Sequence, residues 1–327
     1  MSPFVVILVL NWNSGEDTLR CIRSLEPQSY GNFRILVIDN GSTDGSAARL
    51  RAAIGTSERI ALIENPVNLG YAGGNNLGMQ RALTEGADYI WLFNNDAVAE
   101  PDTLARLVAA AEADPRIGLL SPLIREDGGA VVQFAGGRID LDLPSYTPTQ
   151  EIAQGRAWQD SAPDRVVLWG TAMLVRRATA ERIGLLNEGL FAYWEDIDYS
   201  IRSMNAGFRN TLVFDTAIFH APKPTIDDPL QVKPYYFYFM ARNELLLWRK
   251  FCRPWQQLRA TSWSLRRQVA QLAHMQASAA HVDAVRAGIW DGICGRHGPY
   301  RPPGAIRRQA GGAILSVAKR VFATASA

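Results

Sequence analysis

Cysteine is scarce in this 327-residue chain, and long apolar runs are missing. The three cysteines, Cys21, Cys252 and Cys294, are far apart and fit no metal-binding spacing, which favours a reducing, cytoplasmic compartment. No apolar stretch approaches the roughly 20 residues that cross a bilayer. Residues 1–10 also lack the basic start and small-residue cleavage site of a signal peptide. We therefore expect neither a signal peptide nor a membrane-spanning helix.

The composition is that of a globular protein, with 47% hydrophobic, 20% charged and 9% aromatic residues. This balance excludes a disordered or fibrous chain. The formal net charge is only +2, but it is unevenly spread. From Arg242 onward there are 14 basic and three acidic residues, an excess of +11, which leaves −9 for the rest. The sequence therefore combines an acidic body with a basic C-terminal part.

The first 120 residues alternate short apolar segments with amphipathic ones, a pattern typical of βαβ units. It predicts an α/β fold in which helices flank a mostly parallel sheet. Strands are expected at residues 5–10, 35–38, 60–63 and 89–93, and helices at 14–24, 47–54 and 74–83. A fourth helix is expected after Pro101, with one face formed by Leu104, Leu107, Val108 and Ala111.

The pattern is less regular further along the chain. We expect strands at 131–134, 166–175 and 213–219, and a proline-rich loop at 143–163. A helix is expected at 235–248, and after Pro254 the spacing of Leu258, Leu265, Val269 and Leu272 predicts another, with Arg259, Arg266 and Arg267 on its other faces. The sequence therefore predicts a catalytic domain at 1–230 and a helical, basic region at 231–327.

Polar residues follow each of the first four predicted strands, where ligands bind in open α/β sheets. An aspartate at a strand end can accept hydrogen bonds from a nucleobase or ribose, and a glycine-rich loop lets backbone approach a diphosphate. Taken singly, each segment can also be an ordinary turn or helix start. The segments are Asn11-Trp12-Asn13, Asp39-Asn40-Gly41-Ser42, residues 68–78 with Gly70, Asn75 and Asn76, and Asn94-Asn95-Asp96.

Asp96 ends a hydrophobic strand at a place suited to a divalent cation that bridges a diphosphate. Mg²⁺ and Mn²⁺ prefer oxygen ligands and are commonly shared between a carboxylate and substrate phosphates. The alternative is that Asp96 caps the helix that begins near Pro101.

Three carboxylates lie within four residues at Glu195, Asp196 and Asp198. Like charges raise one another's pKa, which is a setting for a general base. On a helix Asp198 would pair with Arg202, leaving the other two carboxylates to face elsewhere. The alternative is an acidic helix N-terminus, stabilised by the helix dipole. His220 follows a further apolar strand, and a lone histidine is more often a structural hydrogen-bonding group than a ligand.

The order of these motifs, together with Trp169-Gly170-Thr171 and Phe219-His220, resembles the inverting glycosyltransferases of family two, which have the GT-A fold. The resemblance covers about residues 3–222 and is strongest to rhamnosyltransferase-like and galactofuranosyltransferase-like members. It implies transfer of a sugar, with rhamnose a candidate, from a nucleoside-diphosphate sugar to a hydroxyl of a glycan or lipid-linked acceptor. It also implies a role in the synthesis of cell-surface polysaccharide and a divalent metal, Mg²⁺ or Mn²⁺.

The resemblance implies a role for each matching residue. Asp196 would be the catalytic base, Glu195 its acidic neighbour, and Asp96 and His220 the metal ligands. Asn94 stands where the family's Asp-x-Asp motif has its first aspartate, which removes one charge from the metal site. Donor-binding positions would be Trp12, Asn13, Asp39, Gly70, Asn75, Asn76, Asn94 and Asn95, and Gly170, Thr171 and Trp194 would line the acceptor side.

Three other classes of protein compete with this interpretation. A non-catalytic sugar-nucleotide-binding protein would have no need of Asp196 and His220. A nucleotidyltransferase would show a glycine-rich loop with a basic residue after the first strand, where this chain has residues 11–14, Asn-Trp-Asn-Ser. A glycosidase with paired carboxylates would have no use for the loops at Asp39 and Gly70.

The basic C-terminal part is either a solvated helical surface or a binding surface for a polyanion. Tryptophans are interleaved with its arginines, and residues 312–322 are short, apolar and basic. Such segments suit an anionic membrane surface, so peripheral binding to the inner face of the cytoplasmic membrane is expected. No nucleic-acid-binding motif accompanies the charge, which argues against nucleic acid.

Overall fold

A computed structural model describes residues 2–221, 232–274 and 277–323. The chain forms two compact units. Unit 1 contains residues 1–139, 146–188 and 195–222, and unit 2 contains 140–145, 189–194 and 223–327. The predicted domain boundary near residue 230 lies outside the described residues. Two short segments, 140–145 and 189–194, group with unit 2 although they lie far before that boundary.

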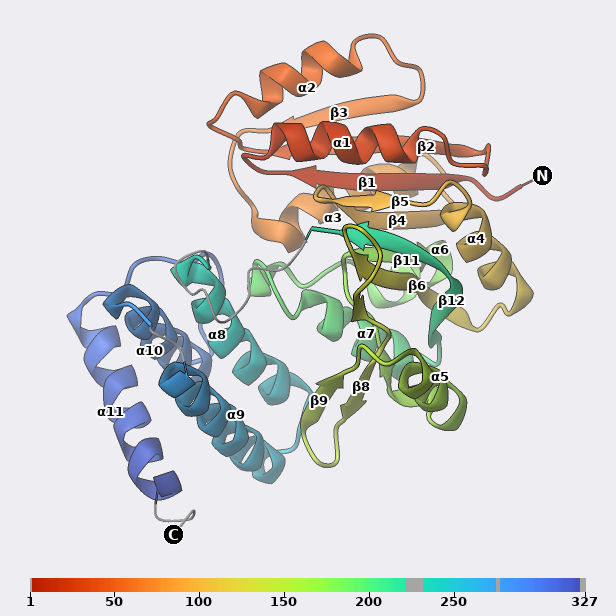
Figure 1. Cartoon of the computed structure of the whole chain (residues 1–327). Helices are drawn as coiled ribbons and strands as arrows, with labels where there is room; N and C mark the ends of the chain where they lie inside the picture. The colour runs from red at the N-terminus through yellow and green to blue at the C-terminus, as the bar shows by residue number, and fades with distance from the viewer. Residues whose placement is uncertain (1, 222–231, 275–276, 324–327) are drawn as a thin grey trace. The chain divides into compact units, whose positions relative to one another are not determined.

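Unit 1 is a curved mixed sheet flanked by helices (Figure 1). The sheet has nine strands in the order β3-β2-β1-β4-β11-β6-β12-β5, with β7 paired to β6, and a second sheet has the order β10-β8-β9. The strands are β1 (Val5–Asn11), β2 (Phe33–Asn40), β3 (Ile60–Asn65), β4 (Tyr89–Asn94), β5 (Ala97–Ala99), β6 (Ile117–Glu126), β7 (Val132–Phe134), β8 (Gly137–Asp140), β9 (Ser145–Pro148), β10 (Val166–Val167), β11 (Ala172–Arg176) and β12 (Arg209–His220). The helices are α1 (Gly15–Leu25), α2 (Ser46–Ile54), α3 (Gly70–Thr84), α4 (Thr103–Ala113), α5 (Ile152–Ser161), α6 (Arg177–Ile183) and α7 (Glu195–Asn205).

The four predicted N-terminal strands form the parallel half of the sheet, which confirms the α/β prediction. They are apolar on both faces because helices cover them, and residues 5–9 of β1 are at most 1% exposed. The predicted face of α4 is buried at all four positions. Strand β1 lies between β2 and β4, with Asn11 opposite Asp39 and Leu10 opposite Asn94. Parallel pairing thus brings the predicted polar segments to one edge of the sheet.

The second half of the sheet changes direction. Strand β11 is antiparallel to both β4 and β6, whereas β12 is parallel to β6 and antiparallel to the short β5. In the last pairing His220 lies opposite Ala97, the residue after Asp96. A residue from the end of β12 is thereby placed beside the end of β4.

Two predictions for the middle of the chain are wrong. The expected loop at 143–163 contains α5, whose Gly155 approaches Ala135 so closely that an added Cβ would lie 1.9 Å from the Ala135 carbonyl oxygen. The expected single strand at 166–175 is two strands, β10 and β11, which belong to different sheets. The break falls at Gly170, whose N–H donates to the Asp196 carboxylate instead of to a neighbouring strand.

Unit 2 contains four described helices: α8 (Pro234–Phe251), α9 (Pro254–His274), α10 (Ala279–Ile293) and α11 (Ala305–Ala323). Helices α8 and α10 pack closely because Gly288 faces Tyr238, where an added Cβ would lie 2.5 Å from the carbonyl oxygen. Phe237, Ala241, Val285 and Ile289 form part of the core between them. Among the described residues, no helix has the length and apolar character needed to cross a membrane.

The predicted helix after Pro254 is α9, but its predicted apolar face is covered over only part of its length. Leu265, Val269 and Leu272 pack on the core of unit 2, whereas Leu258, two turns before Leu265 on the same face, is 77% exposed. Helical spacing alone does not show which part of a face is covered. The buried positions of this helix also include the polar residues Gln256, Ser264 and Gln268.

Candidate active site

The ends of β1 and β2 hold Asp39 in a fixed position. Its carboxylate is 2% exposed and accepts hydrogen bonds from Asn11 Nδ2 at 2.6 Å and from the Ser42 N–H at 3.1 Å. Thr18 in turn donates to Asn11 Oδ1 at 2.8 Å. These hydrogen bonds fix the Asp39 carboxylate before any ligand binds. Its remaining lone pairs therefore already point in set directions.

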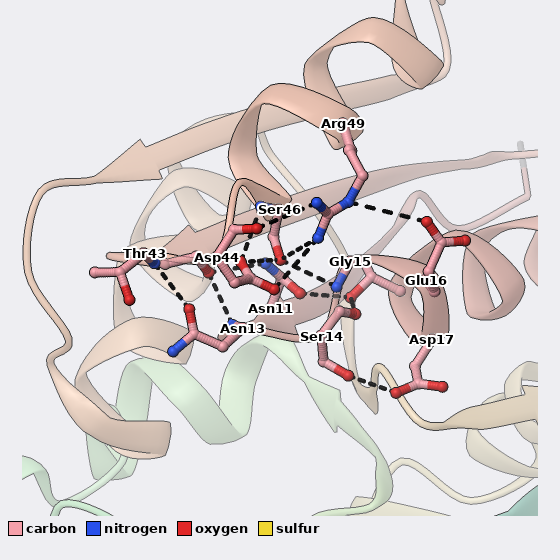
Figure 2. A network of polar contacts seen from close by, with 12 residues as sticks. Asn11, Asn13, Ser14, Gly15, Glu16, Asp17, Thr43, Asp44, Ser46 and Arg49 are labelled. Atoms are coloured by element: carbon pink, nitrogen blue, oxygen red, sulfur yellow. Dashed lines mark hydrogen bonds and ion pairs between the residues drawn. The ribbon is translucent and has the colours of Figure 1, made fainter.

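The loops that follow β1 and β2 are joined to each other (Figure 2). Asn13 accepts from the Thr43 N–H at 2.8 Å, and the Gly15 N–H donates to Ser46 Oγ at 3.1 Å. Asn13 adopts a positive φ of 52°, a conformation that asparagine tolerates better than most residues. Trp12 is 45% exposed, so its ring is available to cover a ligand.

The N-terminus of α3 is fastened to the end of β2. Asn40 Nδ2 donates to the Gly70 carbonyl at 3.0 Å and Asn40 Oδ1 accepts from the Leu69 N–H at 3.1 Å. Asn75 lies one turn into the helix, and its buried Oδ1 has no hydrogen-bond partner in the described part of the chain. Asn76, by contrast, has its amide engaged by the segment 186–188 through three hydrogen bonds.

The end of β4 connects this region to the rest of the sheet edge. Asn95 Nδ2 donates to Thr18 Oγ1 at 2.9 Å, so a chain of hydrogen bonds runs from Asn95 through Thr18 and Asn11 to Asp39.

The neighbouring Asn94 joins β4 to the start of β11, because its N–H donates to the Thr171 carbonyl at 2.9 Å. Its Oδ1 is buried and has no hydrogen-bond partner among the described residues. A buried unpaired oxygen is unfavourable unless a ligand supplies its partner.

Asp96 and His220 lie side by side, with Asp96 Oδ1 3.1 Å from His220 Nε2. His220 Nδ1 is 3.0 Å from Gln133 Oε1, which can only accept, so Nδ1 carries the hydrogen and Nε2 presents its lone pair in the neutral ring. The Gln133 amide is oriented by its Nε2, which donates to the Ala221 carbonyl at 3.1 Å.

This pair fits a divalent cation that is completed by substrate. Carboxylate oxygen and imidazole nitrogen are both ligands of Mn²⁺, and a magnesium-type site needs only one or two protein groups when phosphates supply the others. Within the described residues no group of three or more His, Cys, Asp or Glu side chains is arranged to hold a metal. The protein alone therefore offers a partial coordination sphere.

The acidic motif begins α7, and its carboxylates have different surroundings. Asp196 is partly exposed, and its Oδ2 accepts from the Gly170 N–H at 2.9 Å. Tyr71 donates to the Gly170 carbonyl at 2.7 Å. Gly170 is therefore hydrogen-bonded both to Tyr71 of α3 and to Asp196. Asp198 is buried and pairs with Arg202 at 2.8 Å, which confirms the predicted pairing.

Glu195 is only 5% exposed, and its Oε2 has no hydrogen-bond partner among the residues that the structure describes. Burial, and then the charge of Asp196, raises the pKa of Glu195 well above its ordinary value. The pKa of Tyr71 is also raised well above its ordinary value, first by burial and then by the charges of Glu195, Asp196 and Asp96. The Tyr71 phenol therefore lies close to carboxylates from both the end of β4 and the start of α7.

The sequence reasoning missed two residues of this site, Gln133 and Tyr71. Gln133 gave no signal because its partner is 87 positions away in the chain. Tyr71 lies in the quoted segment after the third strand, but only its contact with Gly170 connects it to Asp196. Both contacts depend on how distant segments pack together, which short-range sequence patterns do not show.

Known proteins with similar sequences transfer sugars. The sequence profile of Glycosyl transferase family 2 matches residues 5–184. The N-acetylglucosaminyl-diphospho-decaprenol L-rhamnosyltransferase of Mycobacterium tuberculosis is 28% identical over 239 residues, which cover 67% of this chain and 76% of the relative. The low-salt glycan biosynthesis hexosyltransferase Agl10 of Haloferax volcanii is 26% identical over 248 residues, 73% of this chain and 74% of the relative.

Solved structures agree at the level of the fold. A mannosyltransferase of Pyrobaculum calidifontis, in complex with GDP-Man and Mn²⁺, matches with a TM-score of 0.59 and 18% identity, covering 98% of this chain and 87% of the other. The profile match, the relatives and the sheet edge described above agree with one another, and the chain belongs to glycosyl transferase family 2, with a GT-A fold.

Proposed function

We propose that this protein is an inverting, metal-dependent glycosyltransferase that moves a sugar from a nucleoside diphosphate to a hydroxyl of a glycan or lipid-linked acceptor. Rhamnose is the candidate sugar, because a rhamnosyltransferase is among the relatives that align over two thirds of the chain. The observation that carries the proposal is the convergence of Asp39, Asp96, His220 and Asp196 on one edge of one sheet.

The donor would lie along the edge formed by β1, β2 and β4. Asp39 would accept a hydrogen bond from the nucleobase, with Trp12 and Asn13 beside it, and the Gly70 segment would approach the ribose and diphosphate. The unpaired oxygens of Asn75 and Asn94 support this placement, because donor hydroxyls would supply their missing partners.

Asp96 and His220 would hold the divalent cation. The cation would neutralise negative charge on the departing diphosphate, which removes the need for an acid that protonates it. Gln133 would keep His220 in the tautomer that presents Nε2 to the cation.

Asp196 would act as the base. Its carboxylate takes the proton of the acceptor hydroxyl, the hydroxyl oxygen forms a bond to the anomeric carbon, and the bond from that carbon to the diphosphate oxygen breaks. Attack opposite the leaving group inverts the configuration. The Gly170 N–H fixes Asp196 by its Oδ2. Neutral Glu195 next to it would let Asp196 carry the single negative charge of the pair.

A lipid-linked acceptor and a location on the inner face of the cytoplasmic membrane complete the proposal. They are supported by the Mycobacterium tuberculosis relative, whose name specifies a diphospho-decaprenol acceptor. A protein that binds sugar nucleotides without turnover is the competing function, and a partly exposed, oriented Asp196 has no use in it.

The test compares Asp196→Asn with the wild type. Losing the base should lower the rate of transfer by about 10²–10⁴-fold while donor binding is preserved. The rate is followed by release of nucleoside diphosphate, and NMR of the product's anomeric proton reports inversion. The matched control is Asp215→Asn, an exposed carboxylate on β12 that should leave the rate unchanged. Equal loss of donor binding and transfer in folded Asp196→Asn would refute the base assignment, and retention in the product would refute the mechanism.

A further inference from the structure

Helix α9 carries a stripe of large apolar and basic side chains on its exposed side. Trp255 is 59% exposed, Leu258 77% and Trp263 50%. Arg259 and Arg266 are also exposed and interleave with them. Each of the five residues lies three or four positions from another member, as in the pairs 255/258, 255/259, 259/263 and 263/266. They therefore form a continuous surface, here named the α9 stripe.

The covered side of α9 carries polar residues beside its apolar ones, which are the buried Ala260 and the core-packing Leu265, Val269 and Leu272. Gln256 is 6% exposed, Ser264 2% and Gln268 1%. Gln256 Nε2 donates to the Leu141 carbonyl at 2.9 Å, and Ser264 Oγ donates to Glu244 Oε2 at 2.5 Å. Soluble helices normally bury their apolar side and expose their polar side. In α9 two tryptophans and a leucine are exposed while two glutamines and a serine are buried, which leaves much of the apolar surface of those three side chains uncovered in the described part of the chain.

The charge on this helix has one sign. Residues 254–274 contain Arg259, Arg266 and Arg267 and no acidic residue. Glu244, an acidic residue in contact with α9, lies on its buried side and is paired with Arg267 at 2.6 Å. The Arg259 guanidinium lies over the Trp263 ring, 5.5 Å from its centroid. The stripe therefore presents tryptophan, leucine and positive charge together.

We propose that the α9 stripe docks on a bilayer that contains anionic phospholipid. Tryptophan prefers the boundary between acyl chains and headgroups, leucine inserts below it, and arginine binds lipid phosphates. A helix in this role lies in the plane of the membrane and does not span it. The inference deepens the proposed lipid-linked acceptor by naming the surface that would meet the membrane, and its test needs neither donor nor acceptor.

Two other occupants fit the stripe less well. A second copy that used the same stripe would bring the arginines of two copies into one contact with no acidic residue from either α9, and like charges disfavour such a symmetric contact. A nucleic acid would use the arginines and stack on the tryptophans, but Leu258, the most exposed member, has no partner in that arrangement.

The experiment is vesicle flotation with the full-length protein. Vesicles of phosphatidylcholine alone are compared with vesicles that contain one third phosphatidylglycerol. The test variant combines Trp255→Ser, Leu258→Ser and Trp263→Ser. The matched control combines Ile306→Ser and Val317→Ser, which are 76% and 61% exposed on α11 and lie in the same basic part of the chain. Circular dichroism verifies that both variants fold, as expected for changes at exposed positions.

The proposal predicts that the wild type floats with the anionic vesicles and not with neutral ones. The α9 variant should lose about tenfold or more of its partition coefficient, since it removes the apolar contacts of an interfacial helix, and the α11 variant should stay within about twofold of the wild type. Unchanged flotation of the α9 variant, or no flotation of the wild type, would overturn it.

Two further results would assign the stripe to another occupant and also overturn the proposal. One is self-association in sedimentation equilibrium that only the α9 variant loses. The other is binding to single-stranded DNA that the α9 variant loses while vesicle binding persists. Vesicle binding with no transfer to any acceptor would instead leave this inference intact and count against the proposed function.

Discussion

Neighbouring carboxylates acquire different properties when only one of them can reach water. Glu195 is buried with an unpaired oxygen, whereas Asp196 is partly exposed and accepts a hydrogen bond from the Gly170 N–H. Burial, and then the charge of Asp196, raises the pKa of Glu195, so Glu195 keeps its proton to a higher pH than an exposed glutamate does. Burial thus distinguishes Glu195 from its neighbour in the chain.

Replacing Glu195 by Gln should make stability less dependent on pH. A raised pKa means that the folded protein holds a proton that the unfolded chain releases, so wild-type stability falls as pH rises from the ordinary pKa of 4.5 toward the folded value. Gln does not titrate. The melting temperature of the variant relative to the wild type should therefore rise with pH across that window, as measured by calorimetry.

The control for this prediction is Glu58→Gln, at an exposed position. Its melting temperature should follow the wild type at every pH. A difference between Glu195→Gln and the wild type that is the same at pH 4 and pH 8 would show that Glu195 titrates normally in the folded protein.

Gln133 should matter for metal binding although it touches no substrate. Its Oε1 holds the hydrogen of His220 Nδ1, and partners of this kind typically change metal affinity by about 10–100-fold. We expect Gln133→Ala to weaken Mn²⁺ binding by that factor, measured by the electron paramagnetic resonance of free Mn²⁺ in the presence of nucleoside diphosphate. The exposed Gln80→Ala on α3 is the control, and equal affinities in the two variants would contradict the role of Gln133.

At the scale of elements, the segment before the acidic motif has an unusual conformation. Phe191, Tyr193 and Trp194 all have positive φ, between 66° and 70°, which is costly for aromatic residues. Asn243 of α8 offsets this cost, since its Nδ2 lies within 2.9 Å of the carbonyls of Leu190, Ala192 and Tyr193. One buried amide therefore organises the turn that leads in the chain to Glu195 and Asp196.

Asn243→Ala should destabilise the protein by about 1–3 kcal/mol, because it removes the donor that Asn243 supplies to the part-buried carbonyls of Ala192 and Tyr193. The free energy of unfolding is measured by urea denaturation. Gln309→Ala, at an exposed position of α11, should have no comparable effect. A loss for Asn243→Ala no larger than that of the control would show that the turn does not depend on this amide.

The elements that could be predicted are those whose sequence pattern depends only on residues close together in the chain. The periodicity of β1 to β4 and of α4 is local, and so was the pairing of Asp198 with Arg202. Helix α5 and the split between β10 and β11 were missed because both depend on contacts with distant segments. Leu258 shares the predicted face of α9 with Leu265 and Val269 but is exposed, because the spacing of apolar residues does not show which part of a face is covered.

At the scale of the whole molecule, parallel and antiparallel pairing bring residues from distant parts of the sequence together. Asp39 ends β2, Asp96 follows β4 and His220 ends β12, and the strand order makes these ends neighbours. We propose that Asp96 and His220, brought together in this way, suffice for metal-dependent donor binding.

Isothermal titration calorimetry tests this claim most directly. UDP-, dTDP- and GDP-sugars are each titrated into the wild type and into Asp96→Ala, with and without Mn²⁺. One nucleotide class should bind the wild type only when Mn²⁺ is present, because Asp96 and His220 would hold the cation and the cation would neutralise charge on the diphosphate. The same donor should bind Asp96→Ala at least about tenfold more weakly. Donor binding that needs no metal and is unchanged in Asp96→Ala, or no binding of any nucleotide sugar, would contradict the account.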